Sequence, residues 1–326
     1  MATIKDVARE AGVAVGTVSK VINNIPVRPA TKVLVEDAIK KLNYEPNIYA
    51  RGLKINKTNT VALIIPTIWN PFFSELAYNI EKNLRNVGFK MILCNSEYNK
   101  LSEIEYITMV KQNKVDGIIA LTYNNIDEYV SSNIPIVSID RYFSENITYV
   151  ASDNLEGGRL AAEKLVECGC KTIAYIGRGS KINNATRNRK KGFVTYCENA
   201  NVTYKMCDLL GSSDEFEVML NKFLIDNFKD NINIDGIFTI TDEQAIDIIE
   251  RLNEFGIKVP EDVQVIGYDG IKVSKNDKIK ISTIRQPIEL IAEKSVEALV
   301  KLIEEKDVDG EIILPVKFIK GYTTIK

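Results

Sequence analysis

The chain has 326 residues, of which 45% are hydrophobic and 26% are charged, and it contains no histidine. This length is typical of two or three domains, and this composition is that of an ordinary soluble globular protein. Without histidine there is no Ser-His-Asp or Cys-His catalytic unit, no histidine-ligated zinc and no imidazole that titrates near neutral pH. Most hydrolase mechanisms are therefore excluded, and we expect near-neutral pH to have little effect on ligand recognition.

The formal net charge of −2 conceals an uneven distribution along the chain. Residues 1–57 carry ten basic and five acidic side chains, a balance of +5, which leaves −7 for the rest. A small basic segment joined to an acidic body is typical of a nucleic-acid-binding module attached to a second function. A solvated basic face without any such function is the alternative interpretation of the charge alone.

The cysteines and the longest uncharged run bear on compartment and cofactors. Five cysteines, an odd number, are scattered through apolar stretches, and Lys5 and its charged neighbours interrupt any secretory signal. These features predict reduced thiols in a cytoplasmic protein. The uncharged run 58–74 contains two prolines, which argues against a membrane span. A single Cys168-Gly-Cys170 pair is a weak metal signal, so we expect neither a metal site nor a cofactor.

The first sixty residues have the pattern of three short helices. Thr3 followed by Asp6 is typical of a capping box at the start of a first helix. Gly12 allows a tight turn, after which helices are expected over about 15–23 and 31–42. This arrangement predicts a helix-turn-helix. The apolar residues expected to form its core are Ile4, Val7, Ala8, Ala11, Val18, Val21, Ile22, Val33, Leu34, Ala38, Ile39 and Leu42.

Two segments of this region resemble a known family. TIKDVAREAGVAVGTVSKVIN (Thr3–Asn23) and LNYEPNIYARGLKINKTNTVALIIP (Leu42–Pro66) resemble the head and hinge of lactose-repressor-type (LacI/GalR) transcriptional regulators. The match is dense and in register, and it continues through the body of the chain. The resemblance implies that residues 1–57 form a DNA-binding head and hinge helix, which bind palindromic double-stranded operator DNA as part of a homodimer.

The resemblance also places the second helix in the major groove, with Val15, Gly16 and Lys20 at base-reading positions. A lysine can donate to guanine acceptors and a valine can contact a thymine methyl group, whereas Gly16 only permits close approach. For Lys20 by itself, a solvated side chain is the alternative. The resemblance further implies phosphate contacts, which position the domain without reading sequence, at Thr17, Ser19 and Asn23, and DNA contacts at Thr3 and Tyr44.

In the family, the segment after Asn-Tyr-x-Pro-Asn becomes a short helix on DNA, and a leucine wedges into the minor groove. Leu53 lies at that position, with Arg51 and Lys54 beside it and Ala50 on the same helical turn. An apolar wedge that partly unstacks a base step kinks the duplex. Without the resemblance, Ala50 and Leu53 would be apolar residues exposed in a charged linker. We therefore predict DNA contacts at all four residues.

From residue 58 onward, short apolar runs alternate with amphipathic helical stretches. Strands are expected at 61–65, 91–94, 117–121, 134–139, 172–176, 236–240 and 263–267, and helices near 73–87, 101–113, 154–168, 188–199, 214–228, 242–255 and 287–305. This alternation predicts an α/β fold with parallel sheets. About 270 residues are too many for one such sheet, so two lobes are expected.

The resemblance implies that residues 58–326 are similar to periplasmic sugar-binding proteins, with two lobes joined by crossing strands and a ligand cleft between them. The expected N-lobe comprises about 58–155 plus 287–315, and the expected C-lobe about 156–286 plus 316–326. This effector-binding part would also form the dimer. The sequence ends at Lys326 without a leucine heptad extension, so we expect a dimer rather than a tetramer. Gly321 replaces an arginine that is usual in the family, and the sequence offers no account of it.

Ligands of open α/β sheets lie beyond the carboxyl ends of the strands. Aromatic rings at those ends can stack on the C–H faces of a sugar, while carboxylates and guanidinium groups bind its hydroxyls. For Phe72 the alternative is a place in the lobe core, and for Asp242 it is a helix cap. The residues that the resemblance places in or beside the effector pocket are Asn70, Phe72, Phe73, Asp140, Arg141, Arg189, Thr241, Asp242 and Asp269.

These features predict a DNA-binding transcriptional regulator, and not an enzyme, that represses carbohydrate-utilisation genes until a small carbohydrate effector closes the lobes and alters the hinge. Arg141 directly after Asp140 resembles sucrose-type regulators. One alternative is a global carbon-catabolite regulator that answers to a protein corepressor. Another is a nucleotide-dependent sugar enzyme, but its phosphate loop at Gly177-Arg178-Gly179 would lack the third glycine, where Ile182 stands.

Overall fold

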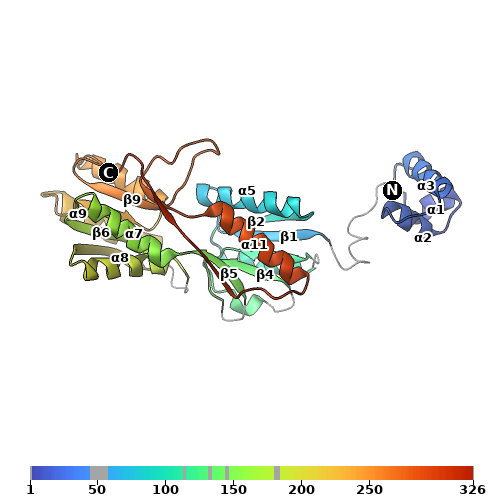
Figure 1. Ribbon diagram of the computed structural model, residues 1–326, viewed down its shortest axis with the longest axis horizontal. Helices are drawn as coiled ribbons and strands as arrows, with labels where there is room; N and C mark the ends of the chain where they lie inside the picture. Colours follow the sequence, from blue (N-terminus) through green and yellow to red (C-terminus); the bar gives the residue numbers. More distant parts are fainter. Residues whose placement is uncertain are drawn as a thin grey trace. The chain divides into compact units, whose positions relative to one another are not determined.

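The computed structural model describes residues 2–44, 58–112, 115–130, 134–143, 147–179 and 184–325. The chain divides into two compact units, Met1–Thr58 and Asn59–Lys326, which we call the head and the body (Figure 1). The predicted DNA contacts Ala50, Arg51, Leu53 and Lys54 lie outside the described residues. None of the described helices is long and apolar enough to cross a membrane.

The head contains the three helices α1 (Ile4–Ala11), α2 (Val15–Ile22) and α3 (Pro29–Lys41). The predicted capping box is confirmed: the Thr3 hydroxyl accepts a hydrogen bond from the Asp6 amide at 3.4 Å, and the Asp6 carboxylate accepts from the Thr3 amide at 2.9 Å. Gly12 ends α1 at φ +64°, a left-handed conformation that favours glycine. These two features fix the start of α1 and the turn into α2.

The core of the head differs from the prediction in α3. Val33 and Leu34 were expected in the core, but they are 55% and 54% exposed, whereas Val35 and Ala38 are buried. The buried face of α3 is centred on Val35 and Ala38, three residues apart, and it continues through the partly buried Leu42. The expectation for Val33 and Leu34 was therefore wrong, because these residues lie off that face.

The described residues of the body form two six-stranded sheets, with the strand orders β11-β5-β4-β3-β1-β2 and β12-β10-β9-β8-β6-β7. All pairings within them are parallel except β10 with β12. We call the first sheet with its helices the N-lobe, which comprises β1 (Thr60–Ile65), α5 (Pro71–Asn86), β2 (Lys90–Asn95), α6 (Lys100–Gln112), β3 (Gly117–Ala120), the short η1 (Asp127–Tyr129), β4 (Ile136–Ile139), β5 (Thr148–Ser152), α11 (Ile288–Ile303) and β11 (Glu311–Leu314).

The second sheet with its helices is called the C-lobe. It comprises α7 (Asn154–Glu167), β6 (Thr172–Gly179), α8 (Arg187–Asn199), β7 (Thr203–Leu210), α9 (Ser213–Phe228), β8 (Gly236–Thr239), α10 (Asp242–Glu254), β9 (Gln264–Asp269), β10 (Thr283–Arg285) and β12 (Lys317–Ile319). The chain passes between the lobes from β5 to α7, from β10 to α11 and from β11 to β12 (Figure 1). The predicted α/β class with parallel sheets is confirmed, but β5, β7, β10, β11 and β12 were not predicted.

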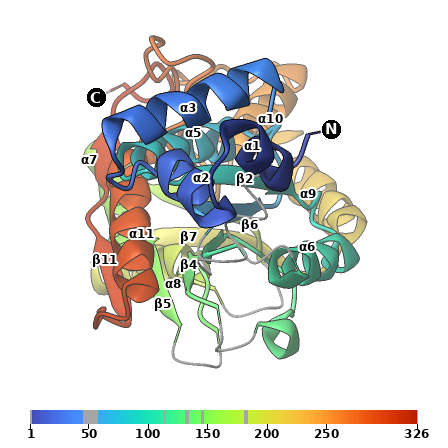
Figure 2. The ribbon, with the colours of Figure 1, turned by 90° about the vertical axis from the view of Figure 1, so that its right-hand side faces the viewer.

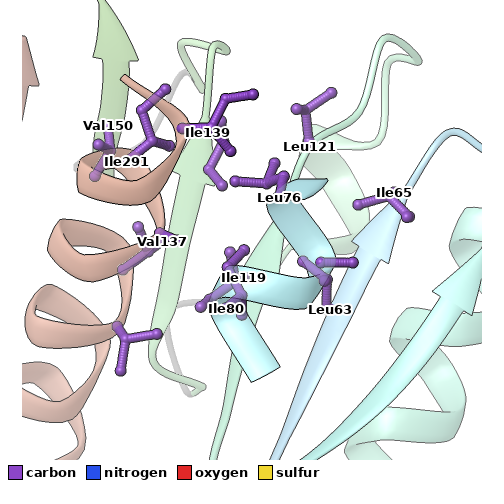
Figure 3. Packing of buried hydrophobic residues seen from close by; sticks show 14 of the residues in the cluster. Leu63, Ile65, Leu76, Ile80, Ile119, Leu121, Val137, Ile139, Val150 and Ile291 are labelled. Atoms are coloured by element: carbon purple, nitrogen blue, oxygen red, sulfur yellow. The ribbon is translucent and has the colours of Figure 1, made fainter. Parts of the chain in front are cut away.

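Helices cover both faces of the N-lobe sheet. Figure 2 shows the helices α5, α11 and α6 around this sheet. Leu63 and Ile65 of β1 pack with α5 and α11, whereas their neighbours Ala62 and Ile64 pack with α6 on the opposite face, as the alternation of side chains along a strand requires. Figure 3 shows the first of these clusters, which includes Leu76 of α5. Full burial of each such side chain contributes about 1.5–3 kcal/mol. The packing holds the N-terminus of α5 at the carboxyl end of β1.

Two glycines allow a close crossing of α7 and α8 in the C-lobe. A Cβ atom on Gly158 would overlap the backbone carbonyl of Arg189, and one on Gly192 would overlap the carbonyl of Leu155. Only glycine permits this approach without displacement of a backbone. Because Arg189 belongs to α8, the crossing sets the depth of its guanidinium group in the C-lobe.

The structure gives a reason for Gly321. A Cβ atom at this position would overlap the backbone of Lys280 and Ile281, and the Gly321 amide donates a hydrogen bond to the Ser282 hydroxyl at 2.9 Å. A side chain, and above all an arginine, would push these two segments apart. The residue is therefore explained by packing at the C-terminus of the C-lobe.

Candidate functional site

A cavity of about 640 Å³ lies between the N-lobe and the C-lobe. Its lining includes Asp140 and Ile240, which directly follow β4 and β8, and Tyr123, which comes shortly after β3. The cavity thus lies beyond the carboxyl ends of the strands in both sheets, where open α/β sheets bind ligands. Of the predicted pocket residues, those in the lining are Asn70, Phe72, Phe73, Asp140, Arg189, Thr241 and Asp269.

The N-lobe side of the cavity is largely aromatic. Phe72 and Phe73 begin α5 and meet edge to face, with their ring centroids 5.3 Å apart. The Asn70 side chain caps this helix by accepting a hydrogen bond from the Phe72 amide at 2.8 Å. Tyr98 and Tyr123 stack on each other, with centroids 6.3 Å apart. Phe72 lines the cavity and is also part of the lobe core.

The C-lobe side is polar and is organised around Arg189. Its Nε donates to the Asn154 side chain and its Nη1 to the Ile240 carbonyl, both at 2.6 Å. Nη1 also lies 3.5 Å from Oδ1 of Asp269, and the guanidinium group lies 3.6 Å from the centre of the Tyr268 ring. These contacts lock the arginine in one orientation, with its charge close to a buried carboxylate.

Two carboxylates of the cavity lie on strained backbone. Asp140 has φ +56° and Asp269 has φ +110°, conformations that residues other than glycine seldom adopt. Such conformations cost about 1–3 kcal/mol each and cluster at functional sites. Asp140 is 2% exposed, and its Oδ1 has no hydrogen-bond partner among the described residues. The fold therefore holds an unsatisfied acceptor at the cavity.

Burial changes the protonation of these groups. It raises the pKa of Asp269 to about 7, although Arg189 and a hydrogen bond from Gln286 at 2.7 Å act in the opposite direction. Burial also raises the pKa of Asp140, against the nearby charge of Arg189. The expectation that near-neutral pH hardly affects recognition does not hold for this cavity, because a buried carboxyl group can titrate there without any histidine.

Hydrogen bonds and ion pairs connect the two lobes beside the cavity. Nδ2 of Asn70, at the start of α5, donates to the Glu243 carboxylate of α10 at 2.6 Å. The Arg285 guanidinium of β10 binds the Glu75 carboxylate of α5 at 2.7 and 3.0 Å. The relative position of the lobes is therefore fixed in part by polar groups, of which Asn70 and Glu243 line the cavity and can be reached by a ligand.

The structure places Arg141 outside the cavity lining, contrary to the prediction. Its guanidinium group is buried, pairs with Asp127, donates to the carbonyl of Asn124 and lies 4.1 Å from the centre of the Phe143 ring. Asp140 lines the cavity on a left-handed backbone at φ +56°, so the chain is not extended at this residue. Arg141, the next residue, makes its contacts within the N-lobe.

Asp242 is also absent from the lining. It is fully buried, its Oδ1 accepts from the Thr283 hydroxyl at 2.6 Å, and its Oδ2 accepts from the Ile271 amide at 2.7 Å. The alternative role as a helix cap belongs to Thr241, which accepts from the Gln244 amide at 3.2 Å. Asp242 instead connects α10 to the β9–β10 region of the C-lobe.

Several lining residues were missed. The rule of strand ends covers Tyr123 and Asn124, which come shortly after β3, and also Tyr98 after β2 and Glu243 after β8. Gln286 follows β10, a strand of three residues that gave no pattern in the sequence.

The second candidate site is the exposed face of α2 in the head. Gly16 and Lys20 are exposed, Val15 is 41% exposed, and a Cβ atom on Gly16 would meet no atom within 4 Å. These residues leave a flat surface on one side of the helix, next to a cationic group. A helix with one open face of this kind fits the major groove.

The other predicted DNA contacts in the head have partners within the protein. The side-chain Nδ2 of Asn23 donates to the Ser19 carbonyl at 2.7 Å, and both side chains are partly buried. Thr3 belongs to the capping box. Thr17 is partly buried, and Tyr44 packs against the core of the head. Contacts of these residues with phosphates remain predictions.

A helix-turn-helix head joined to two parallel α/β lobes with a cavity between them defines a DNA-binding regulator with a body like that of a binding protein. Comparisons with known proteins agree. The family of bacterial regulatory proteins called the lacI family matches residues 3–47, and the periplasmic binding protein-like domain matches residues 162–324. The chain belongs to the lacI family of bacterial regulatory proteins.

Curated relatives match along the whole chain. The sucrose operon repressor of Streptococcus mutans serotype c is 37% identical over 98% of this chain and 99% of its own length. The ribose operon repressor of Halalkalibacterium halodurans is 37% identical, with coverages of 99% and 97%. These relatives are transcriptional repressors, which confirms the prediction of a regulator rather than an enzyme.

A solved structure also matches the body. It is a periplasmic binding protein/LacI transcriptional regulator from Alkaliphilus metalliredigens in complex with D-xylulofuranose, with 32% sequence identity and a TM-score of 0.73. The match covers 82% of this chain and 100% of that chain. The predicted similarity of the body to periplasmic binding proteins is thereby confirmed.

Proposed function

We propose that this protein represses carbohydrate-utilisation genes and that a small sugar bound in the cavity releases it from its operator. The observation that carries the proposal is the composition of the cavity, with aromatic rings on the N-lobe side and a buried Arg189–Asp269 pair on the C-lobe side. Aromatic rings stack on the C–H faces of a sugar, and guanidinium and carboxylate groups bind its hydroxyl groups. The sugar-operon names of both relatives and the sugar in the related structure support the same class of effector.

In the proposed mechanism, two heads of a homodimer read the half-sites of a palindrome. Val15, Gly16 and Lys20 face the bases, and Leu53 wedges the minor groove at the centre. The sugar contacts both lobes and changes their relative position, which disfavours the ordered hinge. Linkage limits this mechanism: the sugar alters DNA affinity only to the extent that it binds the two states of the protein differently.

A thermal-shift panel of mono-, di- and phosphorylated sugars on the full chain tests the effector class. At a sugar concentration of 100 times Kd, the bound state gains about 2.7 kcal/mol, which raises the melting temperature measurably. A rise with at least one sugar is the expected result. If no sugar raises the melting temperature while a phosphorylated carrier protein binds, the corepressor alternative replaces this proposal.

A separate experiment tests whether Leu53 wedges into the minor groove. Leu53→Ala should weaken operator binding at least about 100-fold, because the kinked duplex loses the side chain that unstacks its central step. The sugar-induced thermal shift should remain. Operator affinity equal to that of the unsubstituted chain would contradict the role assigned to Leu53.

A further inference from the structure

We propose that the cavity is selective for uncharged sugars and rejects their phosphorylated forms. This inference rests on the proposed function, since it presumes that a sugar is the effector, and it narrows the chemical class of that sugar. It follows from the charges of the cavity, from the partners of its arginine and from the helix N-termini that face it.

Carboxylates outnumber cations among the described lining residues. The carboxylates are Asp140, Glu217, Glu243, Asp247 and Asp269, and the cations are Arg178 and Arg189. Arg251, outside the lining, neutralises Glu217 and Asp247 in part at 2.8 and 3.0 Å. Asp140 and Asp269 are buried beside Arg189, and Glu243 is an exposed residue of the same lining. A phosphate group would add about two negative charges beside them.

The guanidinium group of Arg189 already has partners within the protein. Arg189 donates to Asn154 and to the Ile240 carbonyl, approaches Asp269 and lies over the ring of Tyr268. A phosphate would have to compete with a buried carboxylate for its charge. Arg178 is exposed at the end of β6, so water weakens its attraction for an anion.

Helix N-termini often bind phosphates through free amide groups and the helix dipole, but those at this cavity are occupied. The first turn of α10 carries Asp242 and Glu243, and the first turn of α9 carries Asp214 and Glu215. Asn70 caps α5. Protein carboxylates or side-chain caps therefore already take the place that an anionic ligand would fill at these three helices.

The N-terminus of α8 has no acidic residue in its first turn, so it is the strongest candidate for an anion site. Its amides are nevertheless engaged: Asn188 donates to the Ala185 carbonyl at 3.0 Å, and Arg189 donates to the Thr186 carbonyl at 3.1 Å. The Thr186 amide donates to the Asn184 side chain at 3.1 Å. Among the described residues before and at the start of α8, the amides of Thr186, Asn188 and Arg189 are therefore already engaged and not free for a phosphate.

The Asp140 carboxylate at the cavity can accept hydrogen bonds but, when ionised, cannot donate them. Oδ1 of Asp140 is buried and has no hydrogen-bond partner among the described residues. A sugar hydroxyl can donate a hydrogen bond to a carboxylate of the lining, whereas a phosphate dianion can only accept. Burial also raises the pKa of Asp140, Asp269 and Glu243. One more anion would force proton uptake, which an uncharged sugar does not require.

The test compares each neutral sugar with its own phosphate on the full chain at constant ionic strength. The pairs are ribose with ribose 5-phosphate, fructose with fructose 6-phosphate, and sucrose with sucrose 6-phosphate. Calorimetry gives Kd, and fluorescence of Trp69, the single tryptophan of the chain and the neighbour of Asn70, reports the same titration. For a sugar that binds, we expect its phosphate to bind at least about 100-fold more weakly.

Variants connect this selectivity to the carboxylates. Glu243→Gln removes one negative charge but keeps an oxygen that can accept from Asn70. The Kd of the sugar phosphate divided by the Kd of the neutral sugar should therefore fall about 5-fold or more. Glu250→Gln is the matched control, since it makes the same charge change on the exposed side of the same helix, outside the lining. It should leave the ratio unchanged. If both variants lower this ratio of Kd values equally, the role of the cavity carboxylates in the selectivity is overturned.

The outcomes separate the two proposals. A phosphorylated sugar that binds as tightly as its neutral form, or more tightly, overturns the selectivity and leaves a sugar effector standing. Failure of every neutral and phosphorylated sugar to bind overturns the sugar effector itself, and the selectivity with it. Binding of the neutral form with a phosphate at least about 100-fold weaker supports both.

Discussion

In the head, the residues proposed to read DNA lie within six positions of one another on the exposed face of α2, from Val15 to Lys20. In the body, the lining of the cavity is assembled from residues as distant in sequence as Asn70 and Gln286. The first site depends on one helix, and the second on the packing of two lobes. Substitutions in the head should therefore act locally on DNA affinity, whereas the cavity is also sensitive to packing at positions that never touch a ligand.

The largest difference in the free energy of unfolding is expected between alanine substitutions of two helical glycines. Gly192→Ala should destabilise the body by about 3 kcal/mol, because the new Cβ would overlap the Leu155 carbonyl and push α7 from α8. Gly16→Ala meets open space and should instead stabilise the head by about 0.5–1 kcal/mol, the helix preference of alanine over glycine. Denaturant unfolding of the full chain measures both. Similar effects of the two substitutions would contradict the close crossing.

The next effect concerns DNA. Lys20→Ala should weaken binding to a preferred operator by about 1–3 kcal/mol, the typical value of one good base contact, and should leave the sugar-induced thermal shift unchanged. Lys40→Ala, an exposed lysine of α3, is the control and should cost less. Fluorescence anisotropy with labelled DNA measures both affinities. If the control weakens binding as much as Lys20→Ala, α2 does not read bases through Lys20.

A further effect, spread over several pH units, is expected from pH in the body. The pKa of Asp269 is about 7 in the folded protein, above its ordinary value of about 3.9, so the folded state binds this proton more tightly than the unfolded chain. The free energy of unfolding should accordingly gain a contribution as pH falls from about 7 toward 4, by up to about 1.4 kcal/mol per pH unit for one proton.

Asp269→Asn should remove this contribution, because the amide does not titrate. The measurement is denaturant unfolding between pH 5 and pH 8 for both chains, and the difference between their slopes isolates Asp269 from the other carboxylates. The Asp242→Asn variant offers a comparison, since its carboxyl group is also buried but lies outside the lining. Identical slopes for Asp269→Asn and the unsubstituted chain would contradict a raised pKa.

The sequence predicted the head in more detail than the body. Local signals such as Thr3, Asp6 and Gly12 fix helix ends within a few residues, and periodicity identified most of the core. It failed at Val33 and Leu34, because apolar residues outnumber the positions on the buried face of α3. Contiguous segments carry their own structural information, whereas the choice among apolar residues depends on the packing of the other two helices.

In the body, periodicity missed short strands and edge strands, and it also missed β5, which is buried along its whole length. β7 lies at the edge of its sheet and mixes polar with apolar residues, and β10 and β12 have three residues each. Position at a strand end predicted Asp140, but it could not say that Arg141 turns into the N-lobe. The direction of a side chain depends on the rotation of the chain after the strand, which the sequence pattern does not contain.

The central claim is that the cavity controls the DNA-binding face, and one coupled titration tests it most directly. An operator is selected by the full chain from random double-stranded DNA, and its affinity is measured with and without a saturating sugar that raises the melting temperature. We predict at least about 10-fold weaker operator binding with the sugar, and by linkage the operator should weaken sugar binding by the same factor. Operator affinity that stays unchanged at saturating sugar would contradict the account.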